Sequence, residues 1–378
     1  MRIFHKFFLT LVLCVSLCLS LWAGKPVDVL FCAYDTGDSN IILRLLPELK
    51  KKRLSYAVLA FGRGADIFKD EKAFYKVRGG SLEDRAQILP EGEVAYIQEE
   101  FEPKIVVTGM ASVGQAQVLM AFPKAKRVAI YDNFDAPAGK EFIQPFAEAI
   151  GRINLYMVPA QFLVPDFKSM FSGTAVEAVG QPALEEWKEV FEKTDRAHLR
   201  KKLKLSATQK VIVFAGGMDD SYPQHLQMFV SVVARHPEWK VFITYHAKTT
   251  GKIERDIVKE TNASNIVVSN DIKTNVLATV ADELVCHKSS VCQQAFSVGV
   301  PCVYVVGEDY HNFLIDKGLV RRVDTEADLE DYLVGRMNEK TQPWTTRLDQ
   351  HQKVMREEGI PSRASALIVQ RLKKLMGE

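Results

Sequence analysis

Short strand-like runs alternate with helix-compatible segments along the first half of the chain. The strand-like runs are residues 27–32, 56–61, 105–108 and 127–131, and residues 41–52 form an amphipathic helical pattern between the first two runs. Strands that alternate with helices are typical of parallel sheets with helices on both faces. This half of the sequence therefore predicts a doubly wound α/β domain.

The same alternation restarts in the second half, after a charged, helix-like bridge. Strand-like runs recur at residues 211–215, 239–245, 265–269, 283–286 and 302–306. The last two contain continuous apolar stretches that are too short for a buried helix, which favours strands buried on both faces of a parallel sheet. We therefore expect two Rossmann-like domains that face each other across a cleft.

The domain boundaries follow from where these patterns start and stop. The first domain is predicted at residues 24–183, a linker helix at 184–206 and the second domain at 207–342. The tail, residues 343–378, has helical periodicity, and we expect its helices to pack back on the first domain.

The N-terminus has the order of a secretory signal. Arg2 and Lys6 precede an apolar run over residues 7–21, and the small residue Ala23 follows it closely. We expect residues 1–23 to direct export to the periplasm or the exterior. If the segment is not cleaved, its apolar run could act as a short membrane anchor, the only membrane contact that we expect.

Composition narrows the classes of partner. The 378 residues are 47% hydrophobic, enough for two buried cores, and the formal net charge of +2 gives no electrostatic case for nucleic acid. Two short basic runs, residues 50–53 and 200–204, are expected to end helices, where cations complement the helix dipole. No cysteine or histidine spacing suggests zinc, and we expect neither a metal nor a cofactor.

Four cysteines remain after residue 23. Cys32, Cys286 and Cys302 lie in or beside apolar runs, so buried free thiols are predicted. In an exported protein, a disulfide bond between Cys286 and Cys302, or one that involves Cys292, is the alternative.

Ligands of open α/β sheets bind beyond the carboxyl ends of the strands, so two loops stand out. In the loop at residues 33–40, Gly37 permits a tight turn and Asp38 can cap a helix or bond a sugar hydroxyl. In the loop at residues 215–222, Gly216 and Gly217 would let backbone N–H groups approach a diphosphate. An ordinary strand-to-helix turn explains the same glycines.

A third polar loop separates the apolar runs at 283–286 and 302–306. His287, Lys288, Ser289 and Ser290 lie at the end of a predicted strand and the start of a predicted helix. Free backbone N–H groups and the helix dipole favour an anion such as a phosphate at this position. Capping of the helix by a serine is the alternative role.

These segments, in this order, resemble the GT-B superfamily, nearest to its lipid-A-disaccharide synthase and UDP-N-acetylglucosamine 2-epimerase branches. The similar segments are the loop at 33–38, the turn at 179–182, the Gly216-Gly217 loop, residues 289–295 with Gly299 and Pro301, and residues 311–319. The resemblance spans nearly the whole chain after residue 23. It implies a nucleotide-sugar donor bound by the second domain, with residues 216–217 and 287–290 among the binding residues.

The sequence departs from the family pattern at two places. The acidic side chain that binds the donor's ribose in the family aligns with Gln293 and Gln294, and an amide lacks the charge-assisted strength of a carboxylate. The arginine of the family's donor loop has no counterpart. The phosphates of a donor would then be neutralised by Lys288, by a helix N-terminus or by no group of the protein.

Several side chains could carry acid or base chemistry in the predicted cleft. From the first half, Asp35 and Asp38 lead a group of candidate general bases, and His246 and His287 each follow a strand in the second half and could act as an acid or contact phosphate. Each of these residues also fits a structural role. The other candidate bases of the first half are Asp132, Asp135 and Glu141.

The sequence thus predicts an exported GT-B-like glycosyltransferase that transfers a sugar from a nucleotide or lipid phosphate donor. One alternative is a degenerate GT-B module that binds a glycan or nucleotide without turnover. Another is a periplasmic solute-binding protein, although the single bridge between the predicted domains is unusual for that class. In each case the expected partner is a small sugar or nucleotide-sugar ligand.

Overall fold

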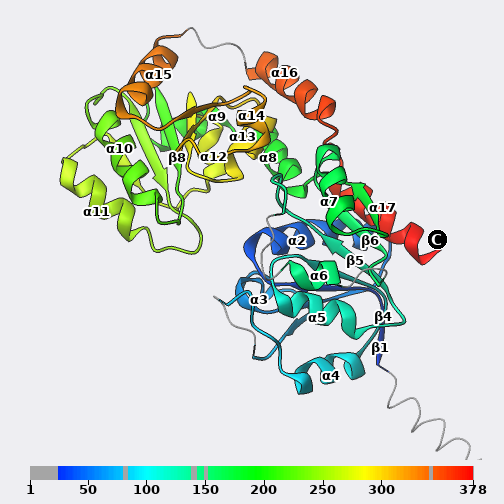
Figure 1. The fold of residues 1–378 in the computed structure, drawn as a ribbon. Coiled ribbons are helices and arrows are strands. Elements are labelled where there is room, and N and C mark those ends of the chain that lie inside the picture. Colours follow the sequence, from blue (N-terminus) through cyan, green and yellow to red (C-terminus); the bar gives the residue numbers. More distant parts are fainter. Residues whose placement is uncertain (1–23, 80–83, 138–142, 149–151, 340–343, 378) are drawn as a thin grey trace, which may run out of the picture. The chain divides into compact units, whose positions relative to one another are not determined.

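The computed structural model describes residues 24–79, 84–137, 143–148, 152–339 and 344–377. The chain forms two compact units, drawn in Figure 1. The first unit ends at Pro182 and resumes with the last helix from Arg363, and the second unit is Ala183–Ser362. The predicted signal segment lies outside the described residues. No helix within the described ranges is long and apolar enough to cross a membrane.

The first unit is built on a seven-stranded parallel sheet in the order β3-β2-β1-β4-β5-β6-β7. The order runs outward in both directions from β1, as the predicted doubly wound fold requires. The strands are β1 (Lys25–Ala33), β2 (Tyr56–Ala60), β3 (Phe74–Lys76), β4 (Phe101–Gly109), β5 (Lys126–Ile130), β6 (Leu155–Val158) and β7 (Ala175–Ala178).

Helix α2 begins and ends with local signals that the sequence carries. Asp35 is its N-cap, in extended backbone, and accepts a hydrogen bond of 2.7 Å from the Thr36 amide. The helix ends in the basic run: Lys52 is the C-cap and Arg53 has φ 57°. The expectation that this run ends a helix is confirmed. The helices of the first unit are α2 (Thr36–Lys51), α3 (Gly62–Phe68), α4 (Glu91–Glu100), α5 (Val113–Ala121), α6 (Gln144–Glu148), the 3₁₀ turn η1 (Gln161–Leu163), α7 (Val164–Met170) and α17 (Ala364–Met376).

The C-terminal helix α17, red in Figure 1, completes the core of the first unit. It packs against α2 and β4. Ile368, Val369 and Leu372 are fully or almost fully buried in the apolar cluster that α2 and the sheet also form. This last helix packs as the sequence analysis expected.

The second unit has a six-stranded parallel sheet in the order β10-β9-β8-β11-β12-β13. Strands β8, β11 and β12 are buried at every residue, as expected for central strands of a parallel sheet, and the buried residues include Glu283 at the start of β11. The strands are β8 (Val211–Ala215), β9 (Lys240–Thr244), β10 (Ile266–Val268), β11 (Glu283–Cys286), β12 (Cys302–Val305) and β13 (Arg321–Val323). The helices are α8 (Pro182–Lys193), α9 (Arg196–Lys202), α10 (Tyr222–Ala234), α11 (Lys252–Thr261), α12 (Thr274–Ala278), α13 (Val291–Ser297), α14 (Phe313–Asp316), α15 (Glu326–Asn338) and α16 (Trp344–Glu357).

Helix α16 differs from the expectation that the whole tail packs on the first domain. It belongs to the second unit and packs on α13. Trp344 Nε1, Arg347 Nε and His351 Nδ1 bond carbonyl oxygens near the end of α13, at 2.7, 2.9 and 2.7 Å. Carbonyls at a helix end need such partners, and the i, i+3, i+7 spacing puts all three donors on one face of α16.

The predicted linker helix is two helices rather than one. Asp195 separates α8 from α9 and accepts a 3.0 Å hydrogen bond from the His198 amide as an N-cap. The second basic run ends α9, where Lys204 has φ 57°.

The four cysteines of the described chain are buried free thiols, as predicted, and the alternative of a disulfide bond is absent among them.

Candidate functional site

Two of the predicted loops meet at the carboxyl edge of the second sheet. Strands β8 and β11 are paired neighbours, with Ala215 opposite Cys286, so the loops that follow them start side by side. Asp219 and Ser221 come from the first loop, and His287 and Lys288 from the second. We call these four residues the Asp219 cluster.

The Asp219 carboxylate is the centre of this cluster. Its Oδ1 lies 3.0 Å from His287 Nε2 and its Oδ2 lies 3.2 Å from Lys288 Nζ. Ser221 Oγ donates to Asp219 Oδ1 at 2.8 Å and accepts from Lys288 Nζ at 3.2 Å. Partial burial alone would raise the pKa of Asp219. The hydrogen bonds from His287, Ser221 and Lys288 outweigh burial and hold that pKa well below its usual range.

His287 is buried and fixed at both ring nitrogens. Its Nδ1 lies 3.0 Å from the Val305 carbonyl oxygen, which can only accept, so Nδ1 is a donor there. Nε2 therefore faces Asp219, with the Ser221 hydroxyl 3.4 Å away. This arrangement gives the ring one orientation, toward the loop that follows β8.

Gly216 and Gly217 make room for neighbouring rings. A Cβ on Gly216 would lie 2.8 Å from the Tyr222 hydroxyl, and one on Gly217 would lie 2.6 Å from His287 Cδ2. The Gly216 amide already donates to the Thr244 carbonyl at 2.8 Å. Both glycines therefore have a packing role, and the approach of their backbone N–H groups to a diphosphate stays a prediction.

Lys288 has a left-handed backbone conformation, which its sequence does not predict. Its φ is 39°, in the left-handed region that residues other than glycine rarely adopt. Such a conformation costs about 1–3 kcal/mol and is common where a side chain is held for function. In this case the ammonium is held over Asp219 and Ser221.

A pocket of about 320 Å³ lies beside the Asp219 cluster. It opens between the loop after β8 and the segment that leads into α11. Tyr222 OH donates to Glu254 at 2.7 Å in its wall, and Glu254 is only 1% exposed. Burial, together with this carboxylate, raises the pKa of Tyr222 well above its usual range. The pocket is lined by Gly217, Met218, Asp219, Tyr222, Thr249, Thr250, Lys252, Ile253 and Glu254.

The residues at the start of α13 have mixed roles. Ser289 Oγ accepts from the Val291 amide at 3.3 Å, whereas Ser290 makes no side-chain cap. Gln293, one of the two glutamines in the place of the family's acidic residue, is 1% exposed, and its Oε1 has no hydrogen-bond partner. Gln294 is half-buried. Gln294 is therefore the more accessible of the two amides.

His246 lies at the same carboxyl edge, directly after β9. Its Nδ1 accepts from the Lys248 amide at 3.1 Å, and its carbonyl accepts from Thr249 Oγ1 at 2.9 Å. The residue thus organises the turn that supplies Thr249 and Thr250 to the pocket wall.

Asp38 is a buried acid of the first unit with a raised pKa. It is 2% exposed and accepts hydrogen bonds from the Tyr34 amide, at 3.1 Å, and from the Gln115 side chain. Burial, followed by the charge of Asp132, raises its pKa to about 7. Gln115, which the sequence did not single out, also donates to the Cys32 carbonyl at 3.0 Å and so fixes the amide in place.

Three other predicted acids of the first unit have contacts of their own. Asp35 caps α2 and forms an ion pair with Arg85. Asp132 approaches Gly37 so closely that a Cβ there would collide with its carboxylate. The Asp135 carbonyl accepts from Tyr131 OH at 2.9 Å, and Glu141 lies outside the described residues.

In the parts of the chain that the structure describes, no three His, Cys, Asp or Glu side chains are grouped as a metal site.

Comparison with solved structures identifies the architecture. UDP-GlcNAc 2-epimerase from Neisseria meningitidis, solved with UDP-GlcNAc bound, is 14% identical and matches over 92% of this chain and 100% of its own, with a TM-score of 0.67. The chain has the GT-B fold. The GT-B match covers both units and confirms the fold that the sequence motifs suggested.

Other GT-B structures match over a similar span. An S. aureus MnaA–UDP structure is 11% identical over 93% of this chain and 97% of its own, with a TM-score of 0.64. The wall teichoic acid polymerase TagF is 15% identical over 94% and 89%, with a TM-score of 0.56. No protein-family model and no curated protein sequence matches the chain.

Proposed function

We propose that this GT-B protein is a glycosyltransferase whose activated sugar donor binds through its phosphate at the Asp219 cluster. The observation that carries the proposal is the convergence of Lys288 and Ser221 on one carboxylate, beside a pocket. A phosphate oxygen, like that carboxylate oxygen, is an anionic acceptor of hydrogen bonds. The donor phosphate would replace the Asp219 carboxylate as the partner of Lys288.

The comparisons support a nucleotide-sugar donor. Two of the structures with the same fold are named for bound UDP-GlcNAc and UDP. A UDP-GlcNAc 2-epimerase and the wall teichoic acid polymerase TagF each match over more than nine-tenths of this chain, which favours an enzyme of this kind over a solute-binding protein. The pocket beside the Asp219 cluster, at about 320 Å³, is within the usual size range of small-ligand sites.

Asp38 is the side chain that we assign to proton transfer. A general base works best when its pKa lies near the operating pH, and the pKa of Asp38 is about 7. Asp35 is instead committed to Arg85 and to the start of α2. We therefore expect Asp38→Asn to abolish transfer while leaving donor binding within about twofold.

Binding is tested by calorimetry and thermal shift on residues 24–378 with UDP, UDP-GlcNAc, CMP, GDP and free sugars. One nucleotide should bind in the micromolar range. Lys288→Gln should weaken it about tenfold or more, because a charge-assisted contact is lost. Lys259→Gln, on the exposed face of α11, is the matched control. A folded protein that binds none of these nucleotides would refute the proposal.

A degenerate binding module is the second candidate, and two observations favour it. Asp219 already pairs with His287 and Lys288, the groups that would hold a phosphate. Glutamines also stand at the positions where the similar family has its acidic residue. Gln294→Glu should then strengthen nucleotide binding. Release of UDP from UDP-GlcNAc separates the two candidates: a transferase releases it in the presence of an acceptor, and a module does not.

We further propose that the protein is exported through residues 1–23. Arg2, Lys6 and the apolar run that follows support this proposal. N-terminal sequencing of the protein from a secreting bacterial host should begin at Gly24. Recovery of the intact N-terminus in the membrane fraction would indicate an uncleaved anchor, and recovery in the cytoplasm would refute export.

A further inference from the structure

A second cavity of this unit lies at the opposite edge of the sheet from the Asp219 cluster. Its volume is about 610 Å³. Asp282, Cys302 and Arg321 stand at the starts of β11, β12 and β13, so the cavity lies at the amino ends of these parallel strands. We call it the amino-edge cavity.

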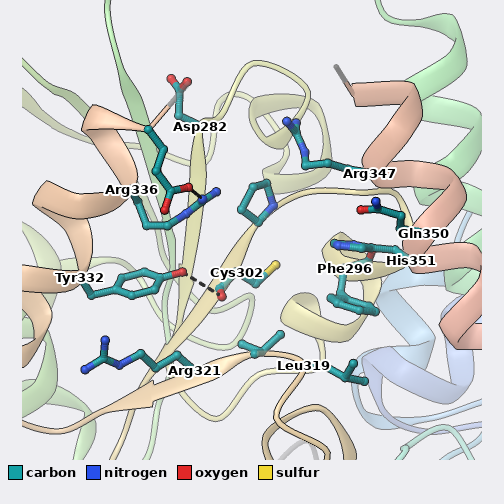
Figure 2. Close-up of a pocket in the computed structure, with 13 residues that line it drawn as sticks. Asp282, Phe296, Cys302, Leu319, Arg321, Tyr332, Arg336, Arg347, Gln350 and His351 are labelled. Carbon is teal, nitrogen blue, oxygen red and sulfur yellow. Dashed lines mark hydrogen bonds and ion pairs between the residues drawn. The ribbon is translucent and has the colours of Figure 1, made fainter. Parts of the chain in front are cut away.

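Two helices close the amino-edge cavity from opposite sides. In Figure 2, Arg336 and Tyr332 enter from α15, and Arg347, Gln350 and His351 enter from α16. The hydrogen bonds from α16 to the carbonyls at the end of α13 hold the second wall in place. His351 stacks on Phe296 with ring centroids 3.9 Å apart, which gives the cavity a flat aromatic side.

Positive charge gathers around this cavity. Arg321, Arg336 and Arg347 all line it. Burial lowers the pKa of Arg347, and the neighbouring charges of Arg336 and Arg196 lower it further. Guanidinium groups that repel one another in a partly buried space would be stabilised by an anion between them.

The acids near the cavity already have partners. Asp282 accepts from the Val211 amide at 2.9 Å and pairs with Lys210. Glu283, beneath the cavity, accepts from Tyr332 OH at 2.8 Å and from Arg336 Nε at 3.1 Å. Glu339, also in the wall, forms an ion pair with Arg336. Asp282 and Glu283 also attract the Arg347 guanidinium, but each acts on its pKa less than Arg336 or Arg196 does.

We propose that the amino-edge cavity binds a small organic anion, with its phosphate or carboxylate between the arginines and its body against the His351 and Phe296 rings. Planar guanidinium groups recognise phosphate and carboxylate oxygens with fixed geometry, and a neutral molecule would leave the positive charge unrelieved. A cavity of about 610 Å³ accommodates a molecule of the size of a sugar phosphate. The bound anion would bridge α15 and α16.

The test is calorimetry on the full chain with glucose 1-phosphate and citrate as probes and glucose as the neutral control. At least one anion should bind saturably in the millimolar range or below, and glucose should not bind. Arg347→Gln and Arg321→Gln should each raise its Kd about tenfold or more. Lys353→Gln, on an exposed part of α16, should change the Kd less than twofold.

Arg347→Gln could weaken binding by loosening α16 rather than by removing a charge. Leu319→Trp avoids this ambiguity, because it keeps every charge of the cavity but fills its space, and it should abolish binding. Lys288→Gln separates this site from the Asp219 cluster and should leave the Kd unchanged. Three results would overturn the proposal: neither anion binds, the anion binds equally well to Leu319→Trp, or Lys288→Gln alone abolishes binding.

Discussion

Gly217 is a position at which an added methyl group would displace the His287 ring and change the shape of the site. The His287 ring lies where a Cβ on Gly217 would be, and Tyr222 limits the space on another side. The ring has no alternative position, because Val305 and Asp219 hold its two nitrogens. The geometry of the Asp219 cluster therefore depends on a residue that contributes no side chain to it.

Gly217→Ala is expected to lower the free energy of unfolding by about 1–3 kcal/mol, the usual cost of overpacking. It should also weaken nucleotide binding, because His287 must move away from Asp219. Urea unfolding and calorimetry measure the two effects. Gly335→Ala is the control: nothing lies within 4 Å of its added Cβ, it sits inside α15, and alanine there should stabilise the protein by about 0.5–1 kcal/mol. Equal effects of the two substitutions would contradict this explanation.

Asp38 should make stability fall as pH rises. Its pKa is raised from 3.8 to about 7 in the folded protein, so between these values the folded state binds a proton that the unfolded state has released. The stabilising contribution of the protonated form is complete below about pH 4 and is lost as the pH rises through about 7. The slope can approach about 1.4 kcal/mol per pH unit for one proton.

Urea unfolding of the wild type and Asp38→Asn between pH 5 and 8, about the range the shift covers, tests this linkage. The difference in unfolding free energy between the two proteins should change in favour of the variant as the pH rises. Asp70→Asn, at an exposed position that follows α3, is the control, and its difference should stay flat. A flat difference for Asp38→Asn as well would mean that the Asp38 carboxyl is ionised throughout.

Sequence reasoning located the loops of the site better than it assigned roles within them. His287, Lys288 and the paired glycines could be predicted because they follow apolar runs that end at one edge of a parallel sheet. Gln115 and Glu254 could not, because each reaches its partner from a helix that is distant in sequence. The engagement of Lys288 with Asp219 depends on loop conformation, which no local pattern records.

Strands were predictable where the apolar run alone determines them. β8 matches its predicted bounds, because full burial on both faces favours an unbroken apolar sequence. β11 also matches its bounds, although it begins with the buried Glu283, whose carboxylate pairs with Arg336. β3 and β13 are three residues long, at the ends of their sheets, and carry charged residues. Pairing with a neighbouring strand, rather than local sequence, makes such segments extended.

Helix α17 should stabilise the first unit through its buried face. Leu372→Ala removes a fully buried side chain and is expected to cost about 2–5 kcal/mol, whereas Gln370→Ala, on the exposed face, should cost less than about 0.5 kcal/mol. Hydrogen exchange locates the effect, and β4 and α2 should lose protection. Loss of protection confined to the second unit would contradict the assignment of α17 to the first.

At the scale of the whole molecule, the sequence predicted the class of fold but not which unit each of the two C-terminal helices joins. Alternating strands and helices indicate two parallel sheets, and both are present. α16 and α17 carry similar helical periodicity, yet one belongs to each unit. Their destinations depend on specific partners: backbone carbonyls for Trp344 and Arg347, and an apolar core for Leu372.

The thiols of the folded molecule should resist an oxidising compartment. Cys32, Cys286, Cys292 and Cys302 are buried free thiols, and thiols react with disulfide reagents only when exposed. The protein that begins at Gly24 should therefore show less than about one reactive thiol with Ellman's reagent when native, and four after denaturation. Four slow but equal reactions in the native protein would indicate that both cores open together.

The return of α17 to the first unit makes the second unit an insertion within it. A chain that is synthesised or threaded across a membrane from its N-terminus presents all of residues 183–362 before the helix that finishes the first core. Until then, Leu45 and Leu49 of α2 lack part of their cover. The first unit therefore emerges first but completes its fold last. A chaperone that binds apolar helix faces would find the uncovered face of α2 exposed for the longest time.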